Sequence, residues 1–246
     1  MFGFIIVSMM GCFHWGPRAT HKLPAQTALD KTYQYNGEVI IIGAGSSGLA
    51  AARVLEQNDI QYTVLEATNQ YGGRLQEDVE FADFPIDLGA EWIHNNKEIL
   101  DVLSGEEGTA ASLELLPYHL DDVYRWEDNE YKRSSQYFLD ARFSFFPEYK
   151  FKDTTWHSFI RTHFAEKVSD NIQFNSPVSR IDYAGERVQV TLQDGEILMS
   201  DKVLVTTSIG VLRAGDIEFY PQLSDQKKDA LSSVRFLPGM KLLLKF

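Results

Sequence analysis

The sequence predicts an α/β fold built on a parallel sheet, and three adjoining segments carry this prediction. Residues 39–42 and 62–65 are short apolar runs, as expected of strands that are buried on both faces of a sheet. Between them, residues 49–57 have the pattern of a helix, and a glycine-rich turn joins the first run to that helix. Strand, turn, helix and strand in this order form a βαβ unit, the building block of parallel sheets.

The glycine-rich turn has the spacing of a dinucleotide-binding site. Gly43 permits a tight turn, Gly45 lets a pyrophosphate approach the backbone because it has no Cβ, and Gly48 allows the helix to pack closely on the strand. The helix N-terminus offers N–H groups and the positive end of a dipole to phosphates. Glu66 directly follows the second strand, where its carboxylate can accept hydrogen bonds from ribose hydroxyls. The sequence therefore predicts a nucleotide-binding βαβ unit.

Two segments beyond Glu66 indicate which nucleotide is bound. Tyr71-Gly-Gly-Arg74 follows closely, and Asp87-Leu-Gly-Ala-Glu-Trp-Ile-His94 comes soon after. Together with the glycine turn they resemble the flavin-containing amine oxidase family, which includes monoamine oxidases, polyamine oxidases and flavin histone demethylases. In that family Gly-Gly-Arg runs beneath the cofactor and the arginine contacts it. An arginine suits this position because its guanidinium donates to several oxygens at once.

The resemblance continues in family order toward the C-terminus. Residues 175–182 look like the family strand that lays a valine, here Val178, against the adenine. Residues 187–199 alternate in polarity around a turn and predict a hairpin. Residues 202–212 resemble the strand and turn that return to the cofactor domain, and residues 217–228 also fit the family order.

The last segment, residues 239–246, resembles the strand that begins with the active-site lysine of the family. Register identifies that lysine as Lys241 rather than Lys245. The resemblance implies that Lys241 reaches flavin N5 through a water. A lysine there could steer the water and favour the reaction with O₂ electrostatically.

The resemblance implies FAD as cofactor, a small-molecule amine as substrate and O₂ as acceptor. In this reaction a hydride leaves the carbon next to nitrogen and O₂ is reduced to peroxide. The expected cofactor-binding residues are Gly43, Gly45, Ser47, Gly48, Glu66, Gly73, Arg74, Gly89, Ala90, Glu91, Trp92 and Val178.

The implied fold is a Rossmann-like FAD-binding domain of the glutathione-reductase type, with an inserted, incomplete α+β substrate domain. We expect the cofactor domain to comprise residues 37–95 and 172–215. A substrate domain that is shorter than in the family would occupy residues 96–171 and resume at 216–246. Residues 1–36 are expected to form a signal-like apolar segment and a tether.

The middle of the chain departs from the family pattern. Residues 121–133 predict a hairpin with a polar tip, and residues 151–164 predict an amphipathic helix capped by Asp153 or Thr154. A substrate assignment by analogy is correspondingly weaker than the cofactor assignment.

Residues 1–13 are almost wholly apolar and too short to span a bilayer. They resemble the apolar part of a signal peptide, although no basic residue precedes Arg18. Met9-Met-Gly-Cys12 faintly resembles a lipoprotein cleavage box. We therefore expect an exported or membrane-anchored protein, and a cytoplasmic protein if the start site is mis-assigned.

Composition narrows the classes of function. Hydrophobic residues make up 44% of the chain and aromatic residues 13%, as in a folded globular protein. The net charge of −12 argues against non-specific binding of nucleic acid. Cys12 is the only cysteine and the six histidines are scattered, so the sequence predicts neither an intrachain disulfide nor a metal site.

Three other hypotheses remain open. The first is another flavin enzyme, such as a carotenoid desaturase or a protoporphyrinogen oxidase. The second, an NAD-dependent dehydrogenase, would explain Gly43–Gly48 and Glu66 but not Arg74. The third is a non-catalytic nucleotide-binding remnant, because the sequence ends at Phe246 inside an apparent strand and resembles only the N-terminal half of the family. A fragment, a shortened gene model and a degenerate copy would all have this appearance, and we expect little amine oxidation from these 246 residues alone.

Overall fold

A computed structural model describes residues 7–8, 31–94, 96–117, 123–138, 140, 148–234 and 241–245. The chain divides into two compact units, which we call the first and the second unit. The first unit comprises residues 1–75 and 160–246, and the second comprises residues 76–159. The boundaries that we expect between functional domains remain predictions. Most of the signal-like segment, including Cys12, lies outside the described residues.

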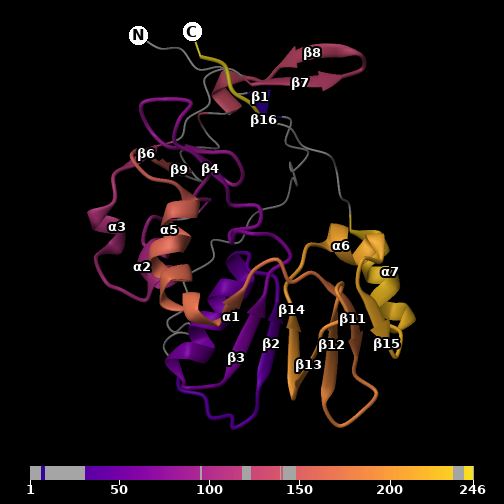
Figure 1. The fold of residues 1–246 in the computed structure, drawn as a ribbon. Coiled ribbons are helices and arrows are strands. Elements are labelled where there is room, and N and C mark those ends of the chain that lie inside the picture. The colour runs from indigo at the N-terminus through magenta and orange to yellow at the C-terminus, as the bar shows by residue number, and fades with distance from the viewer. Residues whose placement is uncertain are drawn as a thin grey trace. The chain divides into compact units, whose positions relative to one another are not determined.

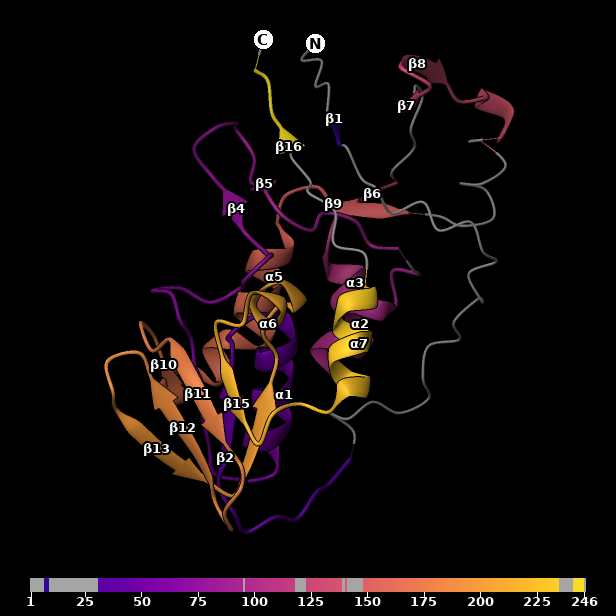
Figure 2. The same ribbon diagram turned by 90° about the vertical axis from the view of Figure 1, so that its right-hand side faces the viewer.

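A parallel sheet forms one half of the first unit, in the strand order β10-β3-β2-β14 (Figure 1). Helix α1, Ser46–Gln57, connects β2 to β3 and packs against both (Figure 2). The predicted βαβ unit is therefore confirmed. The two central strands are largely buried and the edge strand β14 is only partly so, as expected where a strand has one neighbour. The bounds are Val39–Ile42 (β2), Tyr62–Leu65 (β3), Ile172–Gln173 (β10) and Lys202–Val205 (β14).

A second four-stranded sheet has the order β13-β12-β11-β15. β11, β12 and β13 pair antiparallel, which confirms the hairpin predicted over residues 187–199, and β15 joins β11 in parallel. Aliphatic side chains from both sheets form one core cluster, so burial of apolar surface holds the sheets together. The core residues are Ile40, Ile42, Leu65, Val178, Ile181, Val190, Leu192 and Ile217. The strand bounds are Val178–Asp182 (β11), Val188–Leu192 (β12), Ile197–Ser200 (β13) and Glu218–Tyr220 (β15).

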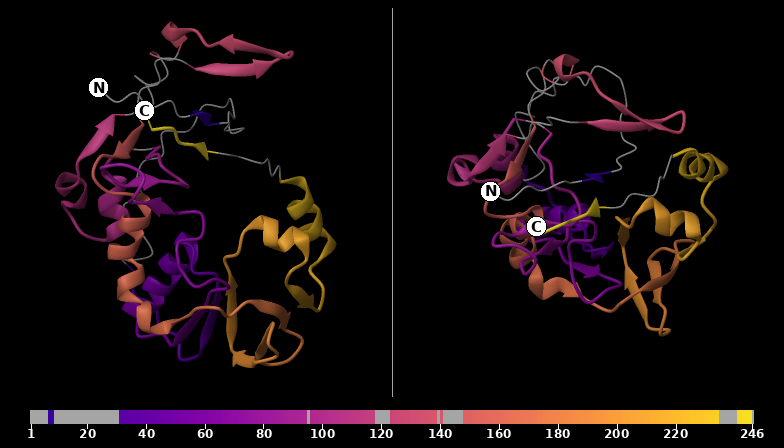
Figure 3. Two further views of the ribbon diagram at one scale, coloured as in Figure 1. Left: turned by 45° about the horizontal axis from the view of Figure 1, so that its top comes forward. Right: turned by 90° about the horizontal axis from the view of Figure 1, so that it is seen from above.

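Shorter elements complete the first unit. Helices α6, Ile209–Ala214, and α7, Asp225–Ser233, lie in contact with each other (Figure 3). Two 3-10 turns, Ala165–Lys167 (η2) and Ser169–Asn171 (η3), lead into β10. The strand expected over residues 241–246 is shorter in the structure. Among the described residues 241–245, Lys241–Leu242 (β16) forms the paired part, antiparallel to Val7–Ser8 (β1).

The described residues of the second unit form three two-stranded antiparallel sheets and include the short helices α2 and α3. The hairpin predicted near residues 121–133 is confirmed for its described part. Asp128 and Asn129 form its tip, both with positive φ angles of 53° and 66°. The bounds are Glu77–Asp78 (β4), Ile86–Asp87 (β5), Ile99–Ser104 (α2), Thr109–Ser112 (α3), Leu115–Pro117 (β6), Tyr124–Glu127 (β7), Glu130–Arg133 (β8) and Tyr149–Phe151 (β9).

Helix α5, Trp156–His163, begins in the second unit and ends in the first. The hydroxyl of Thr155 accepts a hydrogen bond from the N–H of Ser158 at 3.0 Å, which is the geometry of an N-cap. Our expectation of Asp153 or Thr154 as the cap is therefore wrong. The helix starts later than the sequence pattern indicated because residues 149–151 are extended and paired with β6. None of the described helices is long and apolar enough to cross a membrane.

Gly48 offers a test of how closely α1 packs on the turn before it. A Cβ at this position would meet the carbonyl oxygen of Gly43 at 1.9 Å, and a backbone atom cannot move aside as a flexible side chain can. We expect Gly48→Ala to lower the free energy of unfolding by about 1–3 kcal/mol. Urea unfolding measures the loss. In Gly185→Ala the added Cβ would meet its nearest atom at 3.6 Å, so this control should be nearly neutral. Equal stability of the two variants would contradict the packing argument.

Candidate nucleotide-binding site

The three glycines of the turn have different surroundings. Gly43 has a φ of +103°, and a Cβ there would meet the hydroxyl of Thr206 at 3.1 Å. Gly48 is required by packing, as described above. At Gly45, by contrast, a Cβ would meet no atom within 4 Å. The protein alone therefore explains the first and third glycines, while Gly45 borders open space that a ligand could occupy.

The N-terminus of α1 has no side-chain cap. Its N-cap residue is Gly45, and its first turn holds no acidic residue. By comparison, Ser208 caps α6 and Ser224 caps α7, each accepting a hydrogen bond from a backbone N–H. The first N–H groups of a helix have no partner within the helix. An uncapped N-terminus with its positive dipole end therefore suits an anion such as a phosphate.

The peptide of Ala44 is held on both sides. Its N–H donates to Oε2 of Glu66 at 2.8 Å, and its carbonyl oxygen accepts from the N–H of Gly72 at 2.9 Å. From the other side, the hydroxyl of Thr206 at the end of β14 lies 2.9 Å from the carbonyl oxygen of Ile42. These contacts come from three separate segments of the first unit and fix the path of the turn.

The Gly72-Gly73 pair lies directly against the glycine turn. Gly72 and Gly45 form a parallel β-bridge, and a Cβ on Gly73 would lie 3.5 Å from Cα of Gly45. The two glycines have φ angles of 105° and 59°, which favour glycine. Arg74 then has an exposed side chain, with no hydrogen bond or ion pair to any residue that the structure describes. The chain as a whole carries a net charge of −12, so this guanidinium is a local positive charge in an acidic protein. It can donate hydrogen bonds to an anionic ligand beside the turn.

The structure thus brings together most of the predicted cofactor-binding residues of the first unit. Val178 is different, because its side chain is 6% exposed and packs in the core. Lys241 lies in β16, where Ser8 is its partner. Gly89–Trp92 belong to the second unit, between β5 and an isolated bridge from Ile93 to Tyr149. The residues gathered around the turn are Gly43, Gly45, Ser47, Gly48, Glu66, Gly73 and Arg74.

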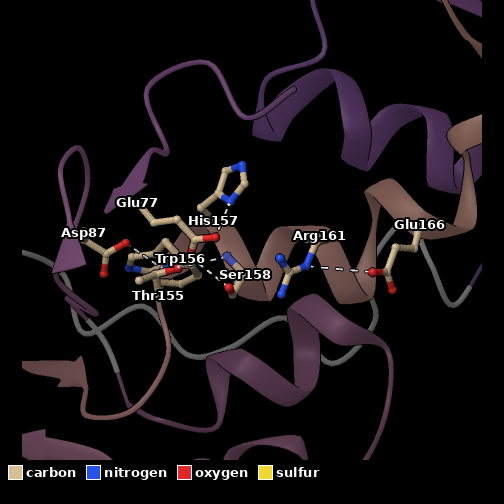
Figure 4. Close-up of polar contacts among 8 residues, drawn as sticks. All are labelled: Glu77, Asp87, Thr155, Trp156, His157, Ser158, Arg161 and Glu166. Atoms are coloured by element: carbon tan, nitrogen blue, oxygen red, sulfur yellow. Dashed lines mark hydrogen bonds and ion pairs between the residues drawn. The ribbon is translucent and has the colours of Figure 1, made fainter. Parts of the chain in front are cut away.

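In the second unit, the carboxylate of Glu77 of β4 makes hydrogen bonds to three residues of one segment (Figure 4). It accepts from the hydroxyls of Thr155 and of Ser158, the latter at 2.8 Å, and its other oxygen lies 3.1 Å from Nδ1 of His157. Asp87 of β5 accepts from the N–H of Trp156 at 2.9 Å. The two carboxylates therefore bind the β4–β5 pair to the first turn of α5.

Two opposing effects act on the carboxyl of Glu77. Burial favours the neutral form, whereas the hydrogen bonds from Thr155 and Ser158 and the contact with His157 favour the anion. The hydrogen bonds prevail and hold the pKa of Glu77 below its ordinary value. The carboxylate is thus a structural anion at a helix N-terminus, where the dipole also favours negative charge.

Comparison with known proteins identifies the family. The model of the flavin-containing amine oxidoreductase family matches residues 46–168 and 158–246. The match covers most of the chain, which therefore belongs to the flavin-containing amine oxidoreductases. This finding favours the flavin interpretation of the glycine turn over a nicotinamide dehydrogenase, which would not belong to this family.

Individual relatives agree with the family assignment. The chain is similar to a lysine-specific histone demethylase 2 of Homo sapiens, with 28% identity over 299 residues, covering 90% of this chain and 36% of the relative. It is also similar to polyamine oxidase 2 of Arabidopsis thaliana, with 23% identity over 315 residues, covering 96% of this chain and 61% of the relative. Polyamine oxidase 4 of Oryza sativa subsp. japonica is 46% identical over 72 residues, or 28% of this chain and 15% of the relative.

The relatives differ from this chain in length. The chain spans 36% of the human demethylase and 61% of the Arabidopsis oxidase. The matched stretch of the demethylase, 299 residues, is itself longer than the 246 residues of this chain. The relatives therefore carry additional residues within the matched region, and the expected shortening of residues 96–171 remains a prediction.

Sequence analysis did not identify several residues that hold the site. Thr206 follows a parallel strand beside the glycine strand, and a hydroxyl residue in that position is the signal that could have revealed it. Thr68 lies two residues beyond Glu66, a spacing at which a hydroxyl can reach a preceding side chain. Glu77 and Asp87 anchor α5 in the second unit rather than the glycine turn, and they carry no comparable signal because their partners at Thr155–Ser158 are distant in sequence.

Glu77 predicts a pH-dependent contribution to stability. Replacing its carboxylate in Glu77→Gln leaves the hydroxyls of Thr155 and Ser158 without a charged acceptor, and should cost about 1–3 kcal/mol of unfolding free energy at pH 7. Because the folded-state pKa is lowered, the contribution is complete above the ordinary value of 4.5 and is lost as pH falls through the folded pKa. Urea unfolding from pH 7 to 3 should therefore show the parent and variant converging at low pH.

The control is Glu114→Gln, which removes an exposed carboxylate paired with Lys152. Exposed pairs contribute less than about 1 kcal/mol, so this variant should stay close to the parent. A Glu77→Gln curve that runs parallel to the parent at every pH would contradict the role of the ionised carboxylate.

Proposed function

We propose that this chain binds FAD at the glycine turn and contributes to the oxidation of an amine. The observation that carries the proposal is the uncapped N-terminus of α1, with open space beyond Gly45. Two charged side chains lie beside the turn. The carboxylate of Glu66 is suited to bind a ribose. The guanidinium of Arg74 is suited to bind phosphate or flavin oxygens. Family membership supports a flavin as the bound dinucleotide.

The donors around the turn fit such a cofactor chemically. The pyrophosphate needs N–H donors and close backbone approach, which the first turn of α1 and Gly45 supply. The backbone nitrogen of Thr207 would lie 3.6 Å from a Cβ on Gly43, and the Thr207 hydroxyl is buried with no hydrogen-bond partner among the described residues. Buried hydroxyls normally have a partner, so Thr207 is a candidate contact for a bound group. We propose that the backbone around Val178 borders the adenine and that Gly89–Trp92 contact the flavin.

When bound, FAD would supply the redox chemistry, as the acceptor of a hydride from the carbon next to the amine nitrogen, and O₂ would be reduced to peroxide. Water hydrolyses the resulting imine. The residues of this chain bind and orient the cofactor. In our proposal Arg74 donates to it and Lys241 places a positive charge near the position where O₂ is reduced, which favours a developing negative charge. Residues 96–171 would contribute to the substrate side.

The alternative is a nucleotide-binding protein without catalysis. It would share the glycine turn and Glu66 but require neither Lys241 nor a substrate cavity. The visible absorbance of bound flavin in the purified chain, followed by assay of peroxide release with mono-, di- and polyamines, separates the two. Flavin without peroxide release would favour the alternative for these 246 residues. An exported or membrane-anchored location also remains our proposal.

The open space at Gly45 tests cofactor binding separately from folding. Gly45→Val meets no protein atom near the new Cβ, so the variant should fold, but its side chain occupies the approach of the pyrophosphate. We expect FAD affinity to fall by at least about tenfold, or ~1.4 kcal/mol. Titration calorimetry measures the affinity and circular dichroism checks folding. Gly185→Val, in a loop of the second sheet, is the matched control. Unchanged FAD affinity in folded Gly45→Val would refute the assignment of the turn.

Lys241 is tested by the reaction with oxygen. In protein loaded with FAD and reduced with dithionite under nitrogen, Lys241→Met should keep the flavin but slow its reoxidation by O₂ by roughly tenfold or more, since a positive charge is removed. Stopped-flow absorbance follows the reoxidation. Lys245→Met removes the same charge at an exposed neighbouring position and should behave as the parent. If Lys245→Met slows reoxidation of the flavin and Lys241→Met does not, the assignment of the family lysine to position 241 is wrong.

A further inference from the structure

The carboxylate of Glu66 is fixed by three donors from two segments. Its Oε2 accepts from the N–H of Ala44 at 2.8 Å. Its Oε1 accepts from both the N–H and the hydroxyl of Thr68, each at 2.9 Å. Thr68 thus contributes two of the three hydrogen bonds that set the direction of this carboxylate.

Thr68 is itself held in place. Its carbonyl oxygen accepts from the N–H of Asn175 at 2.8 Å, and the N–H of Ser176 donates to the carbonyl oxygen of Glu66 at 2.9 Å. Both contacts tie the residues after β3 to the segment that joins β10 to β11. Because its backbone is anchored, Thr68 can hold the side chain of Glu66 in one orientation.

The hydroxyl of Thr68 has one proton and two acceptors within reach. Oε1 of Glu66 lies at 2.9 Å and the carbonyl oxygen of Gln70 at 2.8 Å. The proton can therefore turn from one acceptor to the other without losing a hydrogen bond. A backbone carbonyl is the weaker partner, because hydrogen bonds to a charged acceptor are stronger.

The two proton positions leave Glu66 with different capacities. A carboxylate has about four acceptor positions, two on each oxygen. When the Thr68 hydroxyl donates to Oε1, three of the four acceptor positions are filled, and the one open position is on Oε2. When the Thr68 hydroxyl donates instead to the carbonyl oxygen of Gln70, the N–H of Thr68 fills one acceptor position on Oε1 and the N–H of Ala44 fills one on Oε2. Each oxygen then has one position open, which matches the two adjacent hydroxyls of a ribose.

We propose that Thr68 is a positioning residue for the ribose of the bound dinucleotide. In the free protein it orients Glu66 through both of its donors. When the ribose enters, the Thr68 proton turns to the carbonyl oxygen of Gln70, and each carboxylate oxygen accepts one ribose hydroxyl. The inference rests on the proposed binding of FAD at the glycine turn.

The test compares ligands that differ only in the ribose hydroxyls. Titration calorimetry of the whole chain measures the affinities of FAD, ADP and 2′,3′-dideoxy-ADP. Thr68→Val keeps the shape and the N–H but removes the hydroxyl. We expect it to weaken FAD and ADP by about three- to tenfold, because the carboxylate of Glu66 is then no longer held in the binding orientation before the ribose arrives. Binding of 2′,3′-dideoxy-ADP should change by less than about twofold. Thr68→Ser retains a hydroxyl and should restore the parent affinities.

Two controls separate positioning from a general effect on the fold. Thr191→Val makes the same replacement in β12 and should alter no affinity. In a Glu66→Ala background, Thr68→Val should weaken ADP no further, because its effect passes through the carboxylate.

The outcomes are distinguishable. If the parent protein binds neither FAD nor ADP, the proposed function fails and this inference with it. If the parent binds both and Thr68→Val matches it, the role of Thr68 alone is overturned. Equal weakening of ADP and 2′,3′-dideoxy-ADP, or additive effects of Thr68→Val and Glu66→Ala, would also overturn it, since either result indicates a structural role.

Discussion

The peptide of Ala44 is the point at which three segments of the first unit meet. Glu66 at the end of β3 binds its N–H, and Gly72 binds its carbonyl oxygen. These two contacts hold the glycine turn in a single path, and that path aims the uncapped end of α1 toward open space. Without these contacts the glycines would allow the turn many conformations, and ligand binding would have to supply the free energy that orders the site. The carboxylate of Glu66 therefore braces the turn, and in our proposal it also accepts hydrogen bonds from a ribose.

The two sheets explain why this arrangement is stable before any cofactor binds. Ile42 and Leu65 end the strands that carry the turn and Glu66, and both are buried in the core shared with the second sheet. The backbone on each side of the turn is therefore fixed by packing in addition to the β-ladder. In the second unit the corresponding constraint is polar. There Glu77 and Asp87 hold β4 and β5 to the N-terminus of α5 through hydrogen bonds that their carboxylate oxygens accept.

The family assignment rests on sequence similarity and the candidate site rests on local geometry, and these independent observations agree. The family match covers both units and identifies a flavin enzyme lineage. The glycine turn lies in the first unit, where N–H groups, a carboxylate and an exposed guanidinium surround it. The relatives are longer than this chain, including within the matched region. The cofactor side is thus argued from local geometry, whereas the amine side rests on resemblance.

The sequence by itself determined the βαβ unit, the turn, the hairpin at residues 187–199 and most residues around Ala44. These features are local: glycine spacing and alternating apolar residues report on neighbours a few positions away. Only the tertiary structure showed that Gly45, unlike Gly43 and Gly48, borders open space, because that difference depends on distant atoms such as the Thr206 hydroxyl. It also placed the N-cap of α5 at Thr155, since pairing of residues 149–151 with β6 delays the helix. The ties from Thr68 to residues 175–176 likewise join segments that are far apart in the chain, which no local pattern can encode.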